Sequence, residues 1–562
     1  MVDAENILKR FEAIEMARYE WDGIWQQCSD YVLPRAGQRN RKAHLVFDST
    51  APLALSRFAA AMESLLTPRN RKWHGLSSGL PALDQDPEAG AWLESLRDAL
   101  FAARYSPDSN YANQIFEAYL SLGLYGTAVV FIDDDLGKGL RYKCIPLYEV
   151  YLAEDSVGRV DTVFRWYKLS ARQAAHEFGD ALPEEIKRDA EDPAKMEKEY
   201  EFIHGVFPRR EMLKERPAAL SLPIASVHLA RGARKIVRES GYRSMPYAVS
   251  RFSVSPGDVY GRSPAMEVMP DIVQVNAMKK TILRAAEKMV NPPLLTPDDD
   301  VLSAFSLKAG SINYGGLDDQ GRQRVVPLEL GGNLPIGLEL IEQGRQAIND
   351  GFFLNLFQLL VDSPQKTATE VMEMAWEKAQ LLAPSIGRQQ SELLGTIIER
   401  EMDILVQGGI LEALPPIPPL LVEAWTHGFL PKYETDMSRV MSERDGQTIL
   451  KALSALSSLA QADPTVMSII NTEAAARMLW PAFGGQPSLV RSRQEVEEIR
   501  SEMKLTSGLD SLSALIEKVP KMFAKPGSED LQVMTALVEK GFRSAAGVES
   551  GLNKPSKESG HV

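Results

Sequence analysis

The fold is decided by two stretches of sequence, AMEVMPDIVQVNAMKKTILRAAEKMV (residues 265–290) and PIGLELIEQGRQAINDGFFLNLFQLL (residues 335–360). Apolar residues of the first recur at three- and four-residue spacings, which predicts an amphipathic helix. Asn291-Pro292-Pro293 should end this helix, because proline cannot continue it. Asn333 and Pro335 open the second as a possible N-cap and first-turn proline. Each stretch is roughly 39 Å long if helical, so we expect an antiparallel hairpin of two long helices.

The second helix carries a glycine stripe. Gly337, Gly344 and Gly351 recur every seven residues and therefore share one face. Each glycine costs about 1 kcal/mol relative to alanine, so the stripe costs about 3 kcal/mol. One interpretation is a weak or hinged helix. The other is a packing seam, at which a second helix of the same subunit or of a neighbour approaches closely.

Composition gives the class of the protein. A chain of 562 residues is too long for a single core, and its 44% hydrophobic and 25% charged content is typical of soluble globular proteins. The net charge of −13 argues against a nonspecific coat on nucleic acid, although it is compatible with a channel through which DNA passes. The two cysteines, Cys28 and Cys144, cannot form a disulfide framework, and we expect both to be small core residues.

We expect no targeting or membrane segment. Charges interrupt residues 1–34 throughout, which predicts an amphipathic helix and not a signal peptide. The most apolar stretch, residues 351–361, contains Asn355 and Gln358 and is much shorter than a membrane span. The sequence therefore predicts a soluble protein that is not exported.

The chain around the hairpin is predicted to be α+β and predominantly helical. Before the hairpin, we expect helices ending near Leu66, Arg104 and Leu124 and then an antiparallel sheet between Thr127 and Ser253. Between the two long helices, residues 291–334 read as a short strand-and-turn module. Thr367 to Glu370 form a capping box that opens a helix reaching Gln407.

The C-terminal half of the chain is also expected to be mainly helical. Pro384 should kink the helix that ends at Gln407, and LLVEAW (residues 420–425) reads as a strand. Residues 433–542 should be helical. The final residues, which are rich in Gly, Ser and Lys, are expected to be disordered.

Catalytic, cofactor and metal motifs are not supported by their surroundings. GLSSG (residues 75–79) resembles a nucleophile elbow around Ser77, but the strand and helix that this motif requires are not predicted on either side. VVFIDDD (residues 129–135) resembles a strand that positions a metal-binding aspartate, yet the sequence holds no phosphate-binding P-loop. The aspartates at 298–300 lack the alternating pattern of a calcium loop. The basic clusters at 35–42 and 69–72 are more typical of solvated turns than of DNA contacts.

Several stretches, in this order, resemble the head-to-tail connecting (portal) proteins of podovirus-type tailed bacteriophages. They are WDGIWQQCSDYVLP (21–34), FDSTAPLALSRFAAAMESLLTPRNRKWHGL (47–76), LGLYGTA (122–128), YGRSPAMEVMPDIVQVNAMKK (260–280), AAEKMVNPPLL (285–295), SINYGG (311–316) and KTATEVMEMAWEK (366–378). The resemblance covers roughly residues 10 to 500.

This resemblance implies a portal fold and a ring, typically dodecameric, at one vertex of the capsid. Its parts would be a wing (1–263), a first stem helix (264–290), a clip (291–334), a second stem helix (335–360), a channel loop (361–367), a kinked helix with a strand returning to the wing (368–432), a helical crown (433–545) and a disordered tail (546–562). Double-stranded DNA would pass along the axis. The partners would be the packaging ATPase (terminase), the tail adaptor, the capsid and the scaffolding protein, with no cofactor and no membrane. The ring would assemble in the host cytoplasm and remain in the virion.

The resemblance also suggests which residues face DNA. Lys366 and Gln365 fall in the expected channel loop, and Lys280, Arg284 and Lys288 lie four apart on one face of the first stem helix. The alternative for this basic row is ion pairing with Glu339 or Glu342 of a neighbouring hairpin.

Two other functions remain possible on the sequence. One is a helical oligomeric scaffold or minor capsid protein without a channel. The other is an enzyme that acts on DNA, which would need a metal-dependent activity. A ring with a central hole would distinguish a portal from both.

Overall fold

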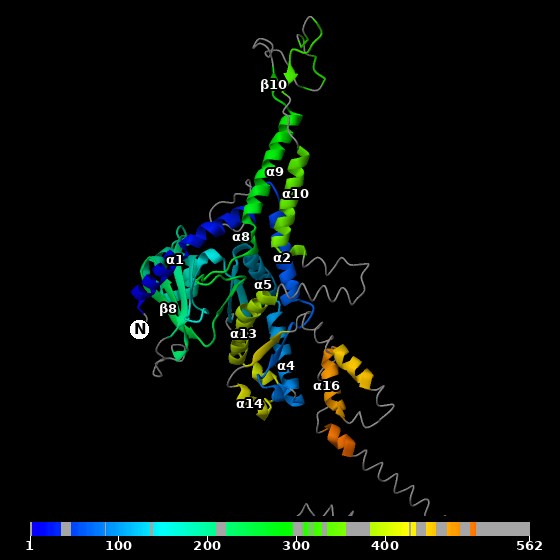
Figure 1. Ribbon diagram of the computed structural model, residues 1–562. Coiled ribbons are helices and arrows are strands. Elements are labelled where there is room, and N and C mark those ends of the chain that lie inside the picture. The colour runs from blue at the N-terminus through cyan, green and yellow to red at the C-terminus, as the bar shows by residue number, and fades with distance from the viewer. Residues whose placement is uncertain are drawn as a thin grey trace, which may run out of the picture. The chain divides into compact units, whose positions relative to one another are not determined.

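The computed structural model describes residues 3–34, 46–84, 86–134, 139–209, 221–295, parts of 306–328, 334–355, 383–425, 429–433, 446–456, 469–483, 490 and 495–501. The chain divides into two compact units, Met1–Pro487 and Ser488–Val562. The description below concerns the first unit, except for the helical residues 495–501 of the second. Helices and several small sheets alternate along it, which confirms the predicted α+β class (Figure 1).

Four N-terminal helices form where the sequence predicts them: α1 (Ala4–Tyr31), α2 (Thr50–Leu66), α4 (Pro87–Arg104) and α5 (Tyr111–Tyr125). A short helix that we did not predict, α3 (Pro81–Asp84), precedes α4. Asp48 opens α2 by accepting a hydrogen bond from the Thr50 backbone N–H at 3.0 Å. Gly126 ends α5 with a φ of 74°, a left-handed conformation that favours glycine. Phe58 of α2 and Leu122 of α5 are buried in the main core between these helices.

The antiparallel region forms two sheets and not the one that the sequence predicts. The first has the order β3-β2-β9, and the second has the order β4-β5-β6-β7-β8. A 3-10 turn at Leu147–Glu149, after Pro146, redirects the chain from one sheet to the other. The strands are β2 (Thr127–Asp134), β3 (Leu140–Cys144), β4 (Val150–Glu154), β5 (Val160–Ser170), β6 (Glu199–Pro208), β7 (Ile224–Ala230), β8 (Lys235–Tyr242) and β9 (Tyr247–Arg251).

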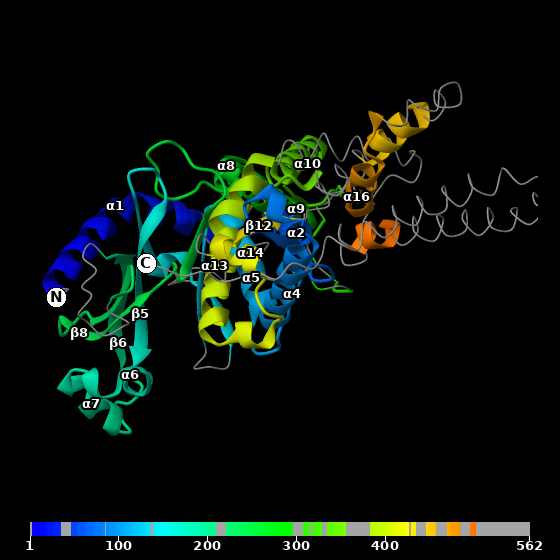
Figure 2. The same cartoon turned by 90° about the horizontal axis from the view of Figure 1, so that it is seen from below.

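Helices cover the five-stranded sheet. Phe11 of α1 packs with Phe164 and Val227 of this sheet, and α1 runs alongside it in Figure 2. Helix α6 (Ala171–Phe178) begins at the capping box of Ser170 and Gln173, and α7 (Glu184–Glu191) follows it. The five-stranded sheet and the helices α1, α6 and α7 together form one lobe, in which side chains of the strands pack against the helices.

The helical hairpin is present, and each of its two predicted helices is interrupted within the described residues. The first is divided into α8 (Pro264–Glu267) and α9 (Met269–Val290, 22 residues), and the break at Val268 comes two residues before Pro270. The second, α10, spans Leu334–Gly351 (18 residues); the predicted helix is interrupted at 352–353, and residues 354 and 355 are helical again. Phe353 has a φ of 60°, which breaks the helix there. Residues 356–360 lie outside the described part of the chain.

The segment that connects the two long helices in the sequence contains a small strand pair. Strand β10 (Leu294–Leu295) pairs antiparallel with β11 (Val326–Pro327), and Leu317 bridges to Gln323. Figure 1 shows β10 at the end of the hairpin remote from α8. This agrees with the predicted strand-and-turn module. The aspartates at 298–300 lie outside the described residues.

The return to the first lobe differs from the prediction. LLVEAW does not form a strand but belongs to helix α14 (Pro419–Trp425). The fixed φ angle of Pro419 suits the first turn of a helix, and the helical conformation leaves Leu421 buried. The returning strand is β12 (Leu430–Tyr433), which pairs with β1 (His74–Ser77), a strand that we did not predict. A short 3-10 helix, Ile410–Ala413, precedes α14.

The helix that ends at Gln407 is irregular at an unexpected place. Its described part starts at residue 383, so the predicted cap at Thr367–Glu370 and the loop 361–367 lie outside the described residues, and Pro384 lies at their edge. A π-helical segment, Gln389–Leu394, precedes α13 (Gly395–Gln407). Helix α16 (Thr472–Ala482) and the helical residues 446–456 and 495–501 agree with the predicted helical C-terminal region. The expected disordered tail lies outside the described residues.

Candidate assembly and channel surfaces of the helical hairpin

The glycine stripe of α10 faces α9. A Cβ added at Gly344 would lie 2.4 Å from Val275 Cγ2, one at Gly351 would lie 2.0 Å from Val268 Cγ1, and one at Gly337 would lie 3.1 Å from Ile282 Cδ1. The three opposing side chains, Val268 at the start of α9 and Val275 and Ile282 within it, are also seven residues apart, so each fills the space left by one glycine. The contact is side chain against glycine, not backbone against backbone. On this geometry we propose that the stripe is the packing seam within the hairpin.

A stem base cluster, made of Asp48, Asn276 and Arg345, ties the hairpin to the start of α2. Arg345 Nη2 donates to Asp48 Oδ2 at 2.7 Å, and Asn276 Oδ1 accepts the backbone N–H groups of Phe47 at 2.6 Å and Asp48 at 3.2 Å. Burial raises the pKa of Asp48, but the hydrogen bonds from Thr50 and Arg345 outweigh it and hold this pKa below its ordinary value. One loop therefore fixes α9, α10 and α2 together.

The π-helical segment closes the edge of the three-stranded sheet. Gln389 Nε2 donates to the Arg251 carbonyl at 2.9 Å, and the Arg251 backbone N–H donates to Glu392 Oε2 at 2.9 Å. The Arg251 side chain also binds Glu392 at 2.9 Å and contacts Glu154 of the second sheet. Two side chains thus satisfy an edge strand that would otherwise expose unpaired backbone groups. The π-helical segment is therefore anchored to the first sheet at Arg251, and Arg251 in turn links it to Glu154 of the second sheet.

A buried ion pair holds α13 against α4. Arg104 Nε and Nη2 donate to the two carboxylate oxygens of Glu401 at 2.8 and 2.5 Å, and both side chains are 0% exposed. Tyr142 donates to Glu401 at 2.5 Å, and Arg104 Nη1 lies 3.0 Å from His74 Nε2. Burial and the charge of Arg104 lower the pKa of His74 well below its ordinary value, so a neutral His74 accepts this bond. Because solvent has no access, the cluster is a structural tie.

The basic row of α9 points away from α10. At about 100° per residue, Lys280, Arg284 and Lys288 lie about 140°, 180° and 220° around the helix from Val275, which faces α10. Arg284 and Lys288 are exposed, and the Lys280 ammonium lies 5.3 Å from the centre of the Phe47 ring. The other predicted channel residues, Lys366 and Gln365, lie outside the described residues.

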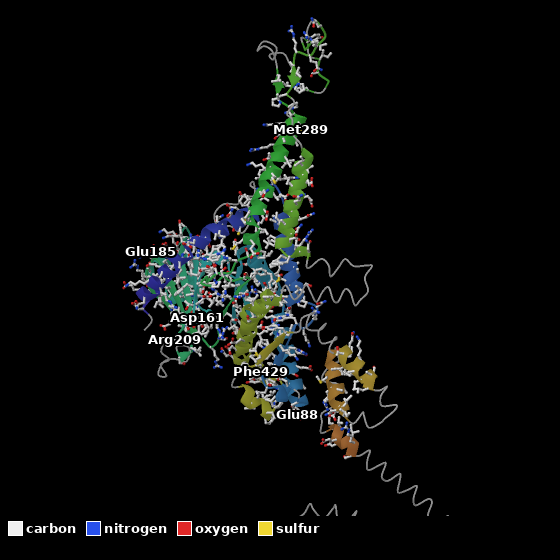
Figure 3. All side chains as sticks on the ribbon, in the orientation of Figure 1. Glu88, Asp161, Glu185, Arg209, Met289 and Phe429 are labelled. Atoms are coloured by element: carbon white, nitrogen blue, oxygen red, sulfur yellow. The ribbon has the colours of Figure 1, made fainter. Side chains whose placement is uncertain are left out.

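Large aliphatic side chains remain exposed on the hairpin. Leu283 is 48% exposed on α9, and on α10 the exposed fractions are 54% for Ile336, 52% for Leu338 and 45% for Leu340. Figure 3 shows side chains projecting from both helices up to the labelled Met289, near the end of α9. Exposed aliphatic residues concentrated on one element are typical of a surface that is covered in an assembly.

The candidate nucleophiles Ser77, Cys28 and Cys144 lie in surroundings that stabilise the fold and do not activate them. The Ser77 hydroxyl donates to Asp84 Oδ2 at 2.5 Å, and burial raises the pKa of the Cys28 and Cys144 thiols to about 12, so neither is a thiolate at neutral pH. Cys28 is buried in the main core, as predicted, and Cys144 is partly buried and packs against that core. Among the described residues, His, Cys, Asp and Glu side chains do not gather in threes as metal ligands would. A helix with the length and apolar character to cross a bilayer is also not found within the described ranges.

Comparison with known proteins gives the family. The sequence matches the family described as "Bacteriophage head to tail connecting protein" over residues 4–490. It is 27% identical over 545 residues to the "Probable portal protein" of Bordetella phage BPP-1, covering 95% of this chain and 97% of that protein. It is 25% identical over 519 residues to the "Portal protein" of Salmonella phage epsilon15, covering 89% of this chain and 91% of that protein. The chain therefore belongs to the bacteriophage head-to-tail connecting protein family.

Proposed function

We propose that this chain is the subunit of a portal ring, which sits at one capsid vertex and surrounds the channel for genome packaging and ejection. The observation that carries the proposal is the hairpin of α9 and α10, which bears the β10–β11 pair between its helices and is fixed at the other end by the stem base cluster. A rigid hairpin tied to a lobe at one end suits a wall built from repeated copies. The family of the chain supports the same function.

The parts of the ring follow from this proposal. Residues 1–263 form the wing, α9 and α10 the stem, and residues 291–334 the clip. Residues 361–367 form the channel loop, and residues 433–545 form the crown. The segment 368–432 leads back to the wing, with β12 as its returning strand in place of residues 420–425. The clip would bind the packaging ATPase and then the tail adaptor, and the outer surfaces would meet the capsid and scaffolding protein.

The proposed role is structural and not enzymatic. DNA that moves through a channel must leave each contact, and every phosphate held by lysine or arginine has to be released at the next step. A net charge of −13 fits a wall that repels DNA more than it binds it. Lys366 and Gln365 of the channel loop are the residues that we propose to touch the duplex.

Electron microscopy of the purified chain tests this function. Closed rings with a central hole, dodecameric in the simplest case, are the expected result. Solid oligomers would favour the non-channel scaffold or minor capsid protein, and a compact monomer would contradict both. Within such rings, Lys366→Glu should lower DNA retention or packaging yield while the yield of rings stays unchanged. Unchanged retention would argue against a channel position for Lys366.

A further inference from the structure

The two outer edges of the hairpin carry mainly opposite charges, although the acidic Glu287 also lies on the outer side of α9. We infer that the basic edge of one subunit, formed by Lys280 and Arg284 of α9, lies against the acidic edge of the next subunit, formed by Glu339 and Glu342 of α10. The partner of this surface is a second copy of the same chain. The inference rests on the proposed ring and names the stem surfaces that meet in it.

The acidic edge is defined in the same way as the basic one. Gly337 faces α9, and at about 100° per residue Glu339 lies about 200° and Glu342 about 140° around α10 from it. Both side chains are exposed, and Glu342 has one partner in its own subunit, Arg345, at 3.4 Å. Glu339 and Glu342 therefore point away from α9, just as Lys280 and Arg284 point away from α10.

Opposite edges of opposite charge favour one kind of oligomer. A two-fold contact would bring like edges together, basic on basic or acidic on acidic, and like charges repel. A head-to-tail contact joins two different surfaces, repeats in one direction, and forms a ring when the rotation closes. Exposed Leu338 and Leu340 flank Glu339 on α10 and would lose solvent contact beside the charged edge. The hairpin thus has the two dissimilar edges that a closed ring requires.

The glycine seam fixes the height of each charge along the hairpin. Because Ile282 packs on Gly337 and Val275 on Gly344, Lys280 lies at the level of Glu339. Arg284 lies about 6 Å nearer the clip than Glu339, within reach of a long side chain, and Lys288 lies about 12 Å nearer the clip. When copies are related by rotation about an axis parallel to the hairpin, Lys280 and Arg284 meet the acidic edge and Lys288 does not. Lys288 therefore serves as a control in the same row.

Two charge-reversed chains test the inference. The chain Lys280→Glu/Arg284→Glu has two acidic edges, and the chain Glu339→Lys/Glu342→Lys has two basic edges. Each alone should give about tenfold fewer rings than the wild type, measured by light scattering and negative-stain images, because repulsion recurs at every interface. An equimolar mixture should recover rings in which the two chains alternate, and this recovery would also show that both chains fold. Lys288→Glu should assemble like the wild type.

The outcomes separate this inference from the function on which it rests. If the wild type forms rings and both reversed chains also do so alone at the wild-type yield, the charged edges do not form the interface. The same conclusion follows if both reversed chains fail alone and the mixture does not recover. Normal rings of Lys280→Glu/Arg284→Glu with altered DNA retention would place the basic row in the channel. A wild type without rings would overturn the proposed function itself.

Discussion

Replacing Gly344 by alanine should destabilise the protein, although alanine is the better helix former. The substitution gains about 1 kcal/mol of helix propensity. It also places a methyl group 2.4 Å from Val275 Cγ2, much closer than an ordinary contact. Val275 is 2% exposed and has no solvent to move into. Overpacking of this kind costs about 1–3 kcal/mol, so we expect a net loss of up to about 2 kcal/mol.

Gly337→Ala is the matched control on the same helix. Its added Cβ would lie 3.1 Å from Ile282 Cδ1, the flexible end of a half-buried side chain that can move aside. Here the propensity gain should prevail, with a stabilisation of up to about 1 kcal/mol. Urea unfolding followed by far-UV circular dichroism would measure both changes.

A double-mutant cycle isolates the clash. Val275→Ala alone loses buried methyl groups and destabilises, but in the Val275→Ala background Gly344→Ala no longer meets a γ-methyl group. We expect a favourable coupling of about 1–3 kcal/mol between the two substitutions. If Gly344→Ala stabilises the protein as much as Gly337→Ala does, the seam does not exist and the glycines mark only a weak helix.

Three further predictions concern the ties that hold the lobes. Glu401→Ala should cost about 3–5 kcal/mol because it leaves the buried charge of Arg104 unpaired, and Arg104→Met/Glu401→Leu should recover most of this loss in a denaturation curve. Acid should weaken the fold: burial lowers the pKa of His204 well below its ordinary value and that of His228 to about 3. The unfolded chain therefore binds more protons below pH about 6.5. His228 should cost the fold about 1.4 kcal/mol of stability per pH unit from there down to about pH 3, and His204 should add a loss in the same direction. His228→Gln should flatten the dependence of stability on pH, and an unchanged slope would refute this reasoning. Asp48→Asn should lower the free energy of unfolding by about 1–3 kcal/mol and speed amide hydrogen exchange in the N-terminal half of α9, which contains Asn276. Unaltered exchange would show that the stem base cluster does not fix the hairpin.

The hairpin is the part of the fold that sequence patterns predict best. The apolar spacing of residues 265–290, the prolines at 292–293 and Pro335 near the start of α10 are local signals, and each acts within a few residues. The seven-residue glycine spacing also indicates a packing face, because it depends only on helix geometry. The start of α6 at Ser170 and the pairing of β2 with β3 around Gly139 likewise depend on residues that are close in the sequence.

The differences arise where distant residues decide the local structure. The short apolar run LLVEAW fits a strand or a helix equally well, and it is helical because Leu421 packs into a core with Trp92, far away in the sequence. Strand β1 exists because β12 pairs with it across more than three hundred residues. The end of α10 depends on one backbone angle at Phe353. Propensity alone does not report such features.

The candidate sites follow the same division. The basic row of α9 is visible in the sequence because its members lie four residues apart, but the opposition of this row to Glu339 and Glu342 depends on which faces of the two helices meet. The pairing of Arg104 with Glu401 also needs the fold, because its members are almost three hundred residues apart. The sequence offers one signal for Arg104 and Glu401: each is a charged residue at a helix position where the apolar pattern predicts a buried side chain.

The measurement that tests the account most directly is a cryo-electron microscopy reconstruction of the purified full-length particle at a resolution that separates helices. The account predicts cyclic symmetry around an open axis, with α9 of each subunit beside α10 of the next and residues 291–334 exposed at one end. A particle without a central opening, or a hairpin enclosed within a single subunit, would contradict it.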